Sequence, residues 1–117
     1  MGGEPYQLVL HAKMYAIGDK YVVDGLKELA KEKFERSCNS HWDTEYFAPA
    51  THFAFSSTLD SGRGLRAVII RTICDHINIL NKPEVMALLH EFNDLAVSLL
   101  EKNAKAIGWT RPKPADV

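Results

Sequence analysis

The sequence has few of the features that mark secreted, membrane-spanning or nucleic-acid-binding proteins. Its only cysteines, Cys38 and Cys74, are too few for a disulfide scaffold, and no secretory signal begins the chain, so we expect reduced thiols and a cytoplasmic or nuclear location. No apolar run approaches the roughly 18 residues of a membrane span. Neither charge sign is in excess, since 14 Lys and Arg face 15 Asp and Glu. Nucleic acids and anionic membranes are not expected as partners, because both select a basic surface.

The chain does contain enough apolar sequence for one folded domain. Its 117 residues are 46% hydrophobic and 25% charged, a balance typical of a soluble domain with a core. Strand signals are scarce, whereas six segments space their apolar residues as helices do. We therefore predict a single all-α domain over residues 1–117, a compact bundle of about six helices. Residues 109–117 carry two prolines and little apolar surface, and we expect a flexible tail.

The first predicted helix, from about Pro5 to Ile17, has two apolar sides. A helical wheel places one set of side chains together and a second set nearly opposite. The first set is Leu8, Val9, Ala12, Tyr15 and Ala16, and the second is Leu10, Met14 and Ile17. A helix with two apolar sides requires cover on both. Gly18 and Asp19 are expected to end it.

The next two helices follow a short connector, residues 21–23. Asp24 is expected to cap a second helix that ends near Ser40. Its single apolar stripe is Leu26, Leu29, Ala30 and Phe34. A third helix is predicted from Asp43 or Thr44 to about Ser56, with a bend at Pro49 because proline lacks an N–H and crowds the preceding turn. Residues 56–64 are predicted to form a loop, with the alternative that a shortened helix begins inside this segment.

The most apolar segment, Leu65–Leu80, is predicted to be the central helix of the bundle. Its apolar residues cover more than half of the helical wheel, and its sixteen residues are too many for a buried strand. A fifth helix begins at Pro83. A sixth is capped by Asn93 or Asp94 and ends at Gly108, with its apolar residues directed inward. These are Leu95, Leu99, Leu100 and Ile107.

None of the titratable residues forms a recognisable active site or metal site. His41 lies three residues after Cys38, but no second ligand pair with the spacing of a zinc site follows. His11 and His76 are expected to be packed imidazoles with hydrogen-bond partners. Cys74 lies in an apolar helix, where a thiol is inert. We therefore expect no catalytic residue, no cofactor and no metal.

Two other functions stay open from the sequence, a helical DNA-binding domain and a small enzyme of unrecognised type. Against the first, the second helix alternates its lysines with glutamates, which cancels the positive field that DNA selects. Against the second, residues 61–64 read SGRG and lack both the ending and the preceding strand of a phosphate-binding loop. No nucleophile elbow of the Gly-x-Ser-x-Gly type is present.

A family resemblance begins in residues 8–30, which read LVLHAKMYAIGDKYVVDGLKELA. This run closely resembles a stretch common in fungal BTB/POZ proteins, in which His-Ala precedes Tyr and Lys-Tyr, and a short link leads to Leu-Lys-x-Leu-Ala. By this resemblance, residues 6–38 correspond to the last two helices of the BTB fold. Trp42–Phe47, Arg63–Arg66 and Lys82–Val85 extend a looser similarity, so that residues 42–107 resemble the BACK-like helical extension found after many BTB domains.

The resemblance implies a non-catalytic protein-interaction adaptor. Such proteins are often homodimers, and some deliver substrates to a cullin-type ubiquitin ligase. The amino-terminal sheet region of a BTB domain is absent from these 117 residues. In an intact domain the second apolar side of the first helix would pack on that sheet-bearing part. We therefore predict that Leu10, Met14 and Ile17 form a protein interface, and that the chain self-associates through them as a two-fold dimer.

Overall fold

All of the regular secondary structure in the described part of the chain is helical, as the sequence predicts. The computed structural model describes residues 4–57 and 63–106, and no strand occurs among them. Over these residues no helix combines the length and the hydropathy that crossing a bilayer requires. The elements are α1 (Gln7–Lys20), α2 (Asp24–His41), α3 (Phe47–Ser57), α4 (Arg63–Asp75), the 3₁₀ helix η2 (Ile77–Asn81), α5 (Pro83–Glu91) and α6 (Asn93–Ala106).

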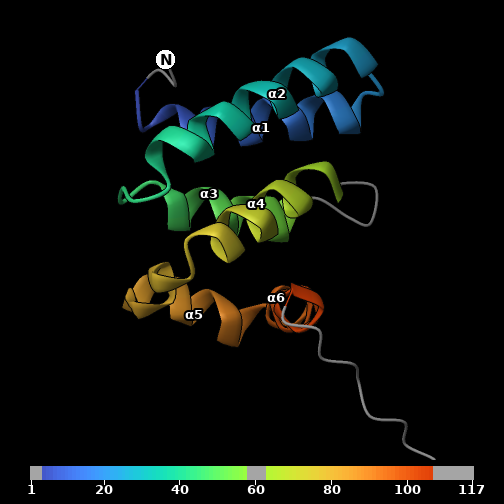
Figure 1. Ribbon diagram of the computed structural model, residues 1–117. Coiled ribbons are helices and arrows are strands. Elements are labelled where there is room, and N and C mark those ends of the chain that lie inside the picture. Colours follow the sequence, from blue (N-terminus) through green and yellow to red (C-terminus); the bar gives the residue numbers. More distant parts are fainter. Residues whose placement is uncertain (1–3, 58–62, 107–117) are drawn as a thin grey trace, which may run out of the picture.

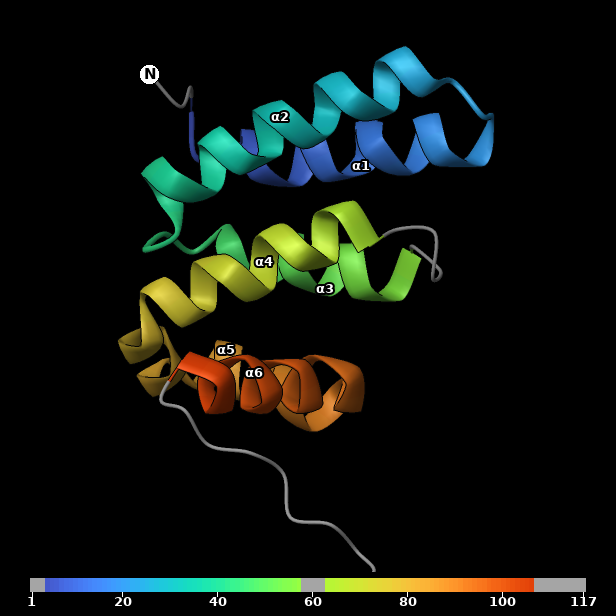
Figure 2. The same cartoon turned by 45° about the vertical axis from the view of Figure 1, so that its right-hand side comes forward.

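The six α-helices of the described ranges form three layers of two helices each (Figure 1). Helices α1 and α2 make the first layer, α3 and α4 the second, and α5 and α6 the third. Within this stack α1 packs on α3 and α3 on α5, while α2 packs on α4 and α4 on α6. The view in Figure 2 shows the same order from a second direction. The α1–α2 layer is therefore covered by the rest of the described fold from one side only.

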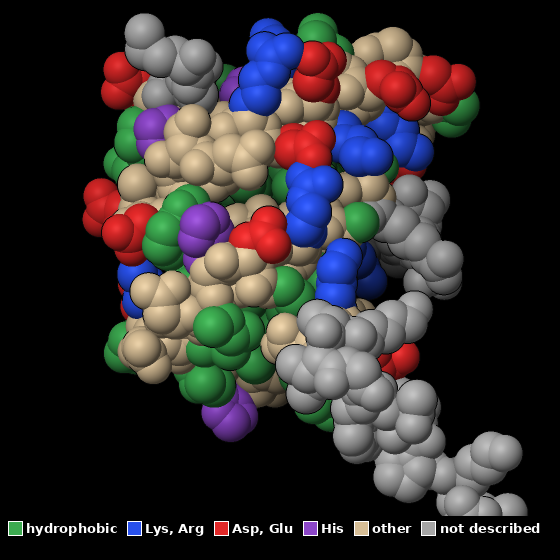
Figure 3. Space-filling view, viewed as in Figure 1, with side chains coloured by type: hydrophobic (Ala, Val, Ile, Leu, Met, Phe, Trp, Pro, Cys, Tyr) green, Lys and Arg blue, Asp and Glu red, His purple; other side chains and the backbone are tan. Residues whose placement is uncertain are grey.

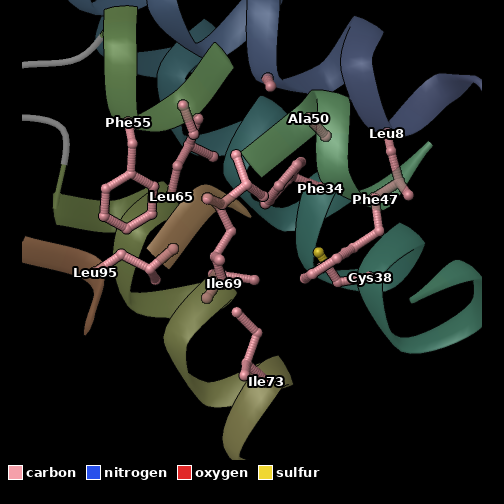
Figure 4. Close-up of a cluster of buried hydrophobic side chains, with 14 of the residues drawn as sticks. Leu8, Phe34, Cys38, Phe47, Ala50, Phe55, Leu65, Ile69, Ile73 and Leu95 are labelled. Atoms are coloured by element: carbon pink, nitrogen blue, oxygen red, sulfur yellow. The ribbon is translucent and has the colours of Figure 1, made fainter. Parts of the chain in front are cut away.

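The core lies between the layers and is built around α4 (Figure 4). Leu65, Ile69 and Ile73 of α4 are completely buried, and they meet Phe34 of α2 and Phe47 of α3. Helix α4 contacts α2, α3, α6 and η2, which agrees with the central position predicted for this segment.

The predicted helix Leu65–Leu80 is wrong in its length, because the segment forms two elements. Helix α4 ends at Asp75, and His76 leaves helical geometry with φ −131° and ψ 60°. The imidazole of His76 stacks on the indole of Trp42, with ring centroids 3.9 Å apart. The chain continues as η2, which buries Ile79 and leaves Ile77 exposed. The helix is therefore interrupted at the residue that stacks on Trp42, which lies in the α2–α3 connection.

Gly18 does not end the first helix, which continues to Lys20. Gly18 is buried, and a Cβ on it would lie 2.9 Å from the backbone nitrogen of Lys27 in α2. The glycine therefore permits a close approach of two helices instead of a turn. The turn follows at residues 21–23, where Val22 has a positive φ of 56°. Asp24 is the first residue of α2, and no side chain caps that helix.

Other expectations at the helix ends need correction. Helix α3 begins only at Phe47, so Pro49 lies in the first turn, where its missing N–H leaves no hydrogen bond unmade. Ser56 and Ser57 belong to α3, and α4 begins at Arg63, before the predicted Leu65. Pro83 is the first residue of α5, as predicted.

Two leucines expected in the core are exposed. Leu29 in α2 and Leu100 in α6 face solvent, while Ala30 and Leu99 beside them are buried. In both helices, fewer positions around the helix are buried than the apolar residues of the sequence indicate. The predicted inward position of Ile107, the stop at Gly108 and the tail 109–117 lie outside the described residues.

Candidate protein-interaction surface on the first helix

The two apolar sides of α1 have different surroundings in the fold. Leu8, Ala12 and Tyr15, from the first side, are buried against α2 and α3. On the second side, Leu10 is 45% exposed and Ile17 is 50% exposed. Met14 is half-buried and touches the edge of the core. The structure thus brings the three predicted interface residues onto one side of α1, with Leu10 and Ile17 facing solvent.

Two tyrosines lengthen this exposed side at either end of the helix. Tyr6 precedes α1 in helical geometry and Tyr21 follows it, and both are more than half exposed. Because residues three or four positions apart share one side of a helix, these five side chains form a continuous row. We call the row the α1 stripe: Tyr6, Leu10, Met14, Ile17 and Tyr21. The tyrosines were missed from the sequence, although their spacing of four from Leu10 and Ile17 would have indicated them.

The scaffold beneath the α1 stripe is fixed by contacts between α1 and α2 close to Gly18. Lys27 Nζ lies 2.9 Å from Asp19 Oδ1 and 5.5 Å from the centre of the Tyr15 ring. The hydrogen bond to Asp19, first among several influences, raises the pKa of Lys27. The close approach at Gly18 and this ion pair hold the two helices together next to their connection. The stripe therefore lies on a helix that is tied to its neighbour by these contacts.

The histidines are dispersed. His11 is buried, and its Nδ1 has no hydrogen-bond partner among the described residues, contrary to the expected fully bonded imidazole. Burial, followed by the charge of Lys33, lowers the pKa of His11 and favours the neutral ring. His52, on α3, instead pairs through Nε2 with Glu91 of α5 at 3.0 Å and is exposed. Over the described ranges, no group of three or more His, Cys, Asp or Glu side chains is placed to hold a metal ion.

The cysteines are not poised as nucleophiles. Burial raises the pKa of Cys38 to about 12, so that its thiol stays protonated at neutral pH. The side chain lies next to Thr72, whose hydroxyl donates a hydrogen bond to the carbonyl of Val68. Burial also raises the pKa of Cys74. Both thiols are free, as expected.

Several charged side chains form ion pairs across or within helices. Arg36 pairs with Glu32 within α2, and Arg71 of α4 pairs with Glu35 of α2. The face shown in Figure 3 has acidic and basic side chains interleaved, without a field of one sign. The interleaving expected for α2 from its sequence is therefore present, and it offers no basic groove on that face for a nucleic acid.

No protein-family model matches this chain, and neither does any curated protein or solved structure. The BTB/POZ resemblance thus rests on the residues that carry it, the run 8–30 and the three shorter segments after it. In the structure, the run 8–30 covers most of α1, the connection and the first part of α2.

Proposed function

We propose that this chain is a non-catalytic protein-interaction module and that the α1 stripe is its binding surface. The observation that carries the proposal is the exposure of Leu10 and Ile17 on one side of α1, each of which the described fold leaves about half uncovered. An uncharged row of this length is costly to leave in water, since apolar area favours burial by roughly 25 cal/mol per Å².

The position of α1 in the stack supports this proposal. In stacked helical architectures an end layer needs a polar outer side, because no further layer covers it. The α1–α2 layer is such an end, yet it leaves Leu10, Ile17 and Leu29 exposed. The proposal extends to the family resemblance: in a BTB-type adaptor, the sheet-bearing part would cover this side. Delivery of substrates to a cullin-type ligase would then be a property of the longer adaptor.

In these 117 residues we propose a second copy as the occupant of the stripe. A two-fold contact places the same surface of each copy against the other. Because the side chains of the α1 stripe are uncharged, such a contact brings no like charges of the stripe together. Leu10 and Ile17 are already about half covered, so that burying the remainder contributes about 1 kcal/mol for each side chain. With similar contributions from Tyr6 and Tyr21, two copies gain roughly 8 kcal/mol. Association costs roughly 4–15 kcal/mol, and the dimer is therefore weak and concentration-dependent.

Sedimentation velocity across about 10 µM to about 1 mM protein tests this proposal. The parent chain should shift from monomer to dimer, while Leu10→Glu and Ile17→Glu should stay monomeric. These two positions are preferable to Met14, which also touches the core. Val97→Glu is the matched control, because Val97 is 48% exposed on α6 in the opposite end layer. A parent that is monomeric throughout, or a Leu10→Glu dimer as stable as the parent's, would refute self-association through the stripe.

A further inference from the structure

A second surface lies beside the α1 stripe, in a groove between the end of α1 and α3. The groove has a volume of about 570 Å³. Its apolar walls are Ala16 and Ile17 from α1 and Phe53 from α3, and Asp19 and Ser57 also line it. Helices α1 and α3 belong to neighbouring layers (Figure 2). The groove is therefore a gap at the side of a layer boundary, with room for a large apolar side chain.

The rim of this groove is positively charged. Lys13 Nζ lies 6.0 Å from the centre of the Phe53 ring, and Lys20 Nζ lies 5.5 Å from that of Tyr21. Within the described residues, neither lysine has a carboxylate within 4.0 Å. The only carboxylate in α1 and α3 is Asp19, which is already paired with Lys27. The groove thus combines an apolar floor with the ammonium groups of Lys13 and Lys20, while the one carboxylate in its lining, that of Asp19, is paired with Lys27.

We propose that this groove binds an acidic segment of a partner protein, with one apolar side chain between Ile17 and Phe53 and carboxylates at Lys13 and Lys20. The two lysines are seven residues apart, about 10.5 Å along the helix axis. Carboxylates two turns apart on a helix span the same distance, and an apolar residue between them points to the same side. The proposal adds a second binding surface to the proposed interaction module and does not require the dimer.

The charge of the rim decides between a second copy and an acidic partner. If two copies met through their grooves, a two-fold contact would place Lys13 and Lys20 of each against those of the other. Like charges at an interface select against that pairing. The α1 stripe carries no charge and can meet itself, whereas the groove is complementary to Asp or Glu.

The test uses a fluorescently labelled helical peptide with one central Phe and a Glu three or four residues to either side. Binding is measured by fluorescence anisotropy, and amide chemical shifts locate the site. We expect saturable binding that shifts the amides of Ala16, Ile17 and Phe53. Replacing the Phe by Ala, or both Glu by Gln, should weaken binding about tenfold.

Charge reversal on the protein makes the test specific. The Lys13→Glu/Lys20→Glu variant should lose about tenfold in affinity for the Glu peptide and regain it for a peptide with Lys at those positions. Lys102→Glu on α6 is the control, since Lys102 is exposed in another layer and should have no effect. Equal binding of the Glu and Gln peptides, or an unchanged affinity in the double variant, would overturn the proposal.

The two proposals fail separately. Leu10→Glu should abolish the dimer and leave peptide binding intact, because Leu10 does not line the groove. The double lysine variant should leave the dimer in place, because neither lysine belongs to the α1 stripe. A monomeric parent that still binds the peptide removes the dimer alone. A dimeric parent whose monomeric Leu10→Glu variant does not bind the peptide removes the groove alone.

Discussion

Replacing Gly18 with alanine should destabilise the protein, although alanine is the better helix former. A Cβ at this position would lie 2.9 Å from the backbone nitrogen of Lys27, 3.1 Å from its Cα and 3.2 Å from its Cβ. The nearest of these atoms belong to the backbone of α2, so that the clash is relieved only if the two helices separate. Overpacking of this kind costs about 1–3 kcal/mol, against a gain of about 1 kcal/mol in helix propensity. We expect a net loss of up to about 2 kcal/mol.

Gly25→Ala is the matched control for this prediction. Gly25 lies in the first turn of α2, and a Cβ there would meet none of the surrounding described atoms within 4 Å. The same substitution should therefore stabilise the fold by about 0.5–1 kcal/mol. Urea unfolding followed by far-ultraviolet circular dichroism measures both variants. The reasoning is refuted if Gly18→Ala unfolds at a urea concentration equal to or above that of the parent chain.

Three further predictions concern buried side chains. Burial lowers the pKa of His11, so the imidazole takes up a proton more readily in the unfolded chain than in the folded one. The free energy of unfolding should therefore fall as the pH is lowered from about 7.5 to about 5.5. In His11→Leu, urea unfolding should show a smaller fall over the same pH range. In a Cys74→Ser background, a thiol reagent should modify Cys38 only as fast as the protein unfolds, because burial raises the pKa of Cys38 to about 12. Calorimetry of Leu65→Ala should show a loss of about 2–5 kcal/mol, whereas Leu100→Ala, at an exposed position, should change stability by less than about 0.5 kcal/mol.

The sequence correctly predicts the buried side of α1 from helical spacing, although the same reasoning fails for Leu29 and Leu100. Leu8, Ala12 and Tyr15 are spaced three or four residues apart, and the fold buries all three. The prediction fails at Gly18, where local preference indicates a break and tertiary packing requires a residue without a side chain. A glycine can end a helix or allow two helices to approach closely, and the neighbouring residues do not indicate which of the two it does.

The end of α4 shows a second limit of the same kind. The apolar repeat continues from Ile73 to Ile77, yet α4 ends at Asp75 and His76 has a non-helical backbone conformation. The indole on which His76 stacks is that of Trp42, 34 positions earlier in the chain. Periodicity within one segment carries no information about such a distant partner. For the same reason the groove could not be predicted, because Lys13 and Phe53 meet only once α1 and α3 occupy neighbouring layers.

The two proposed surfaces share Ile17, which belongs to the α1 stripe and also lines the groove. A dimer that buries this side chain must therefore compete with the acidic peptide for it. Competition of this kind is reciprocal, so the peptide should weaken the dimer by the same factor by which the dimer weakens peptide binding. The apparent peptide affinity should fall as protein concentration rises through the dimerisation range, and in Leu10→Glu it should be independent of concentration. A peptide affinity that stays constant in the parent chain while its dimer forms would show that Ile17 is not shared.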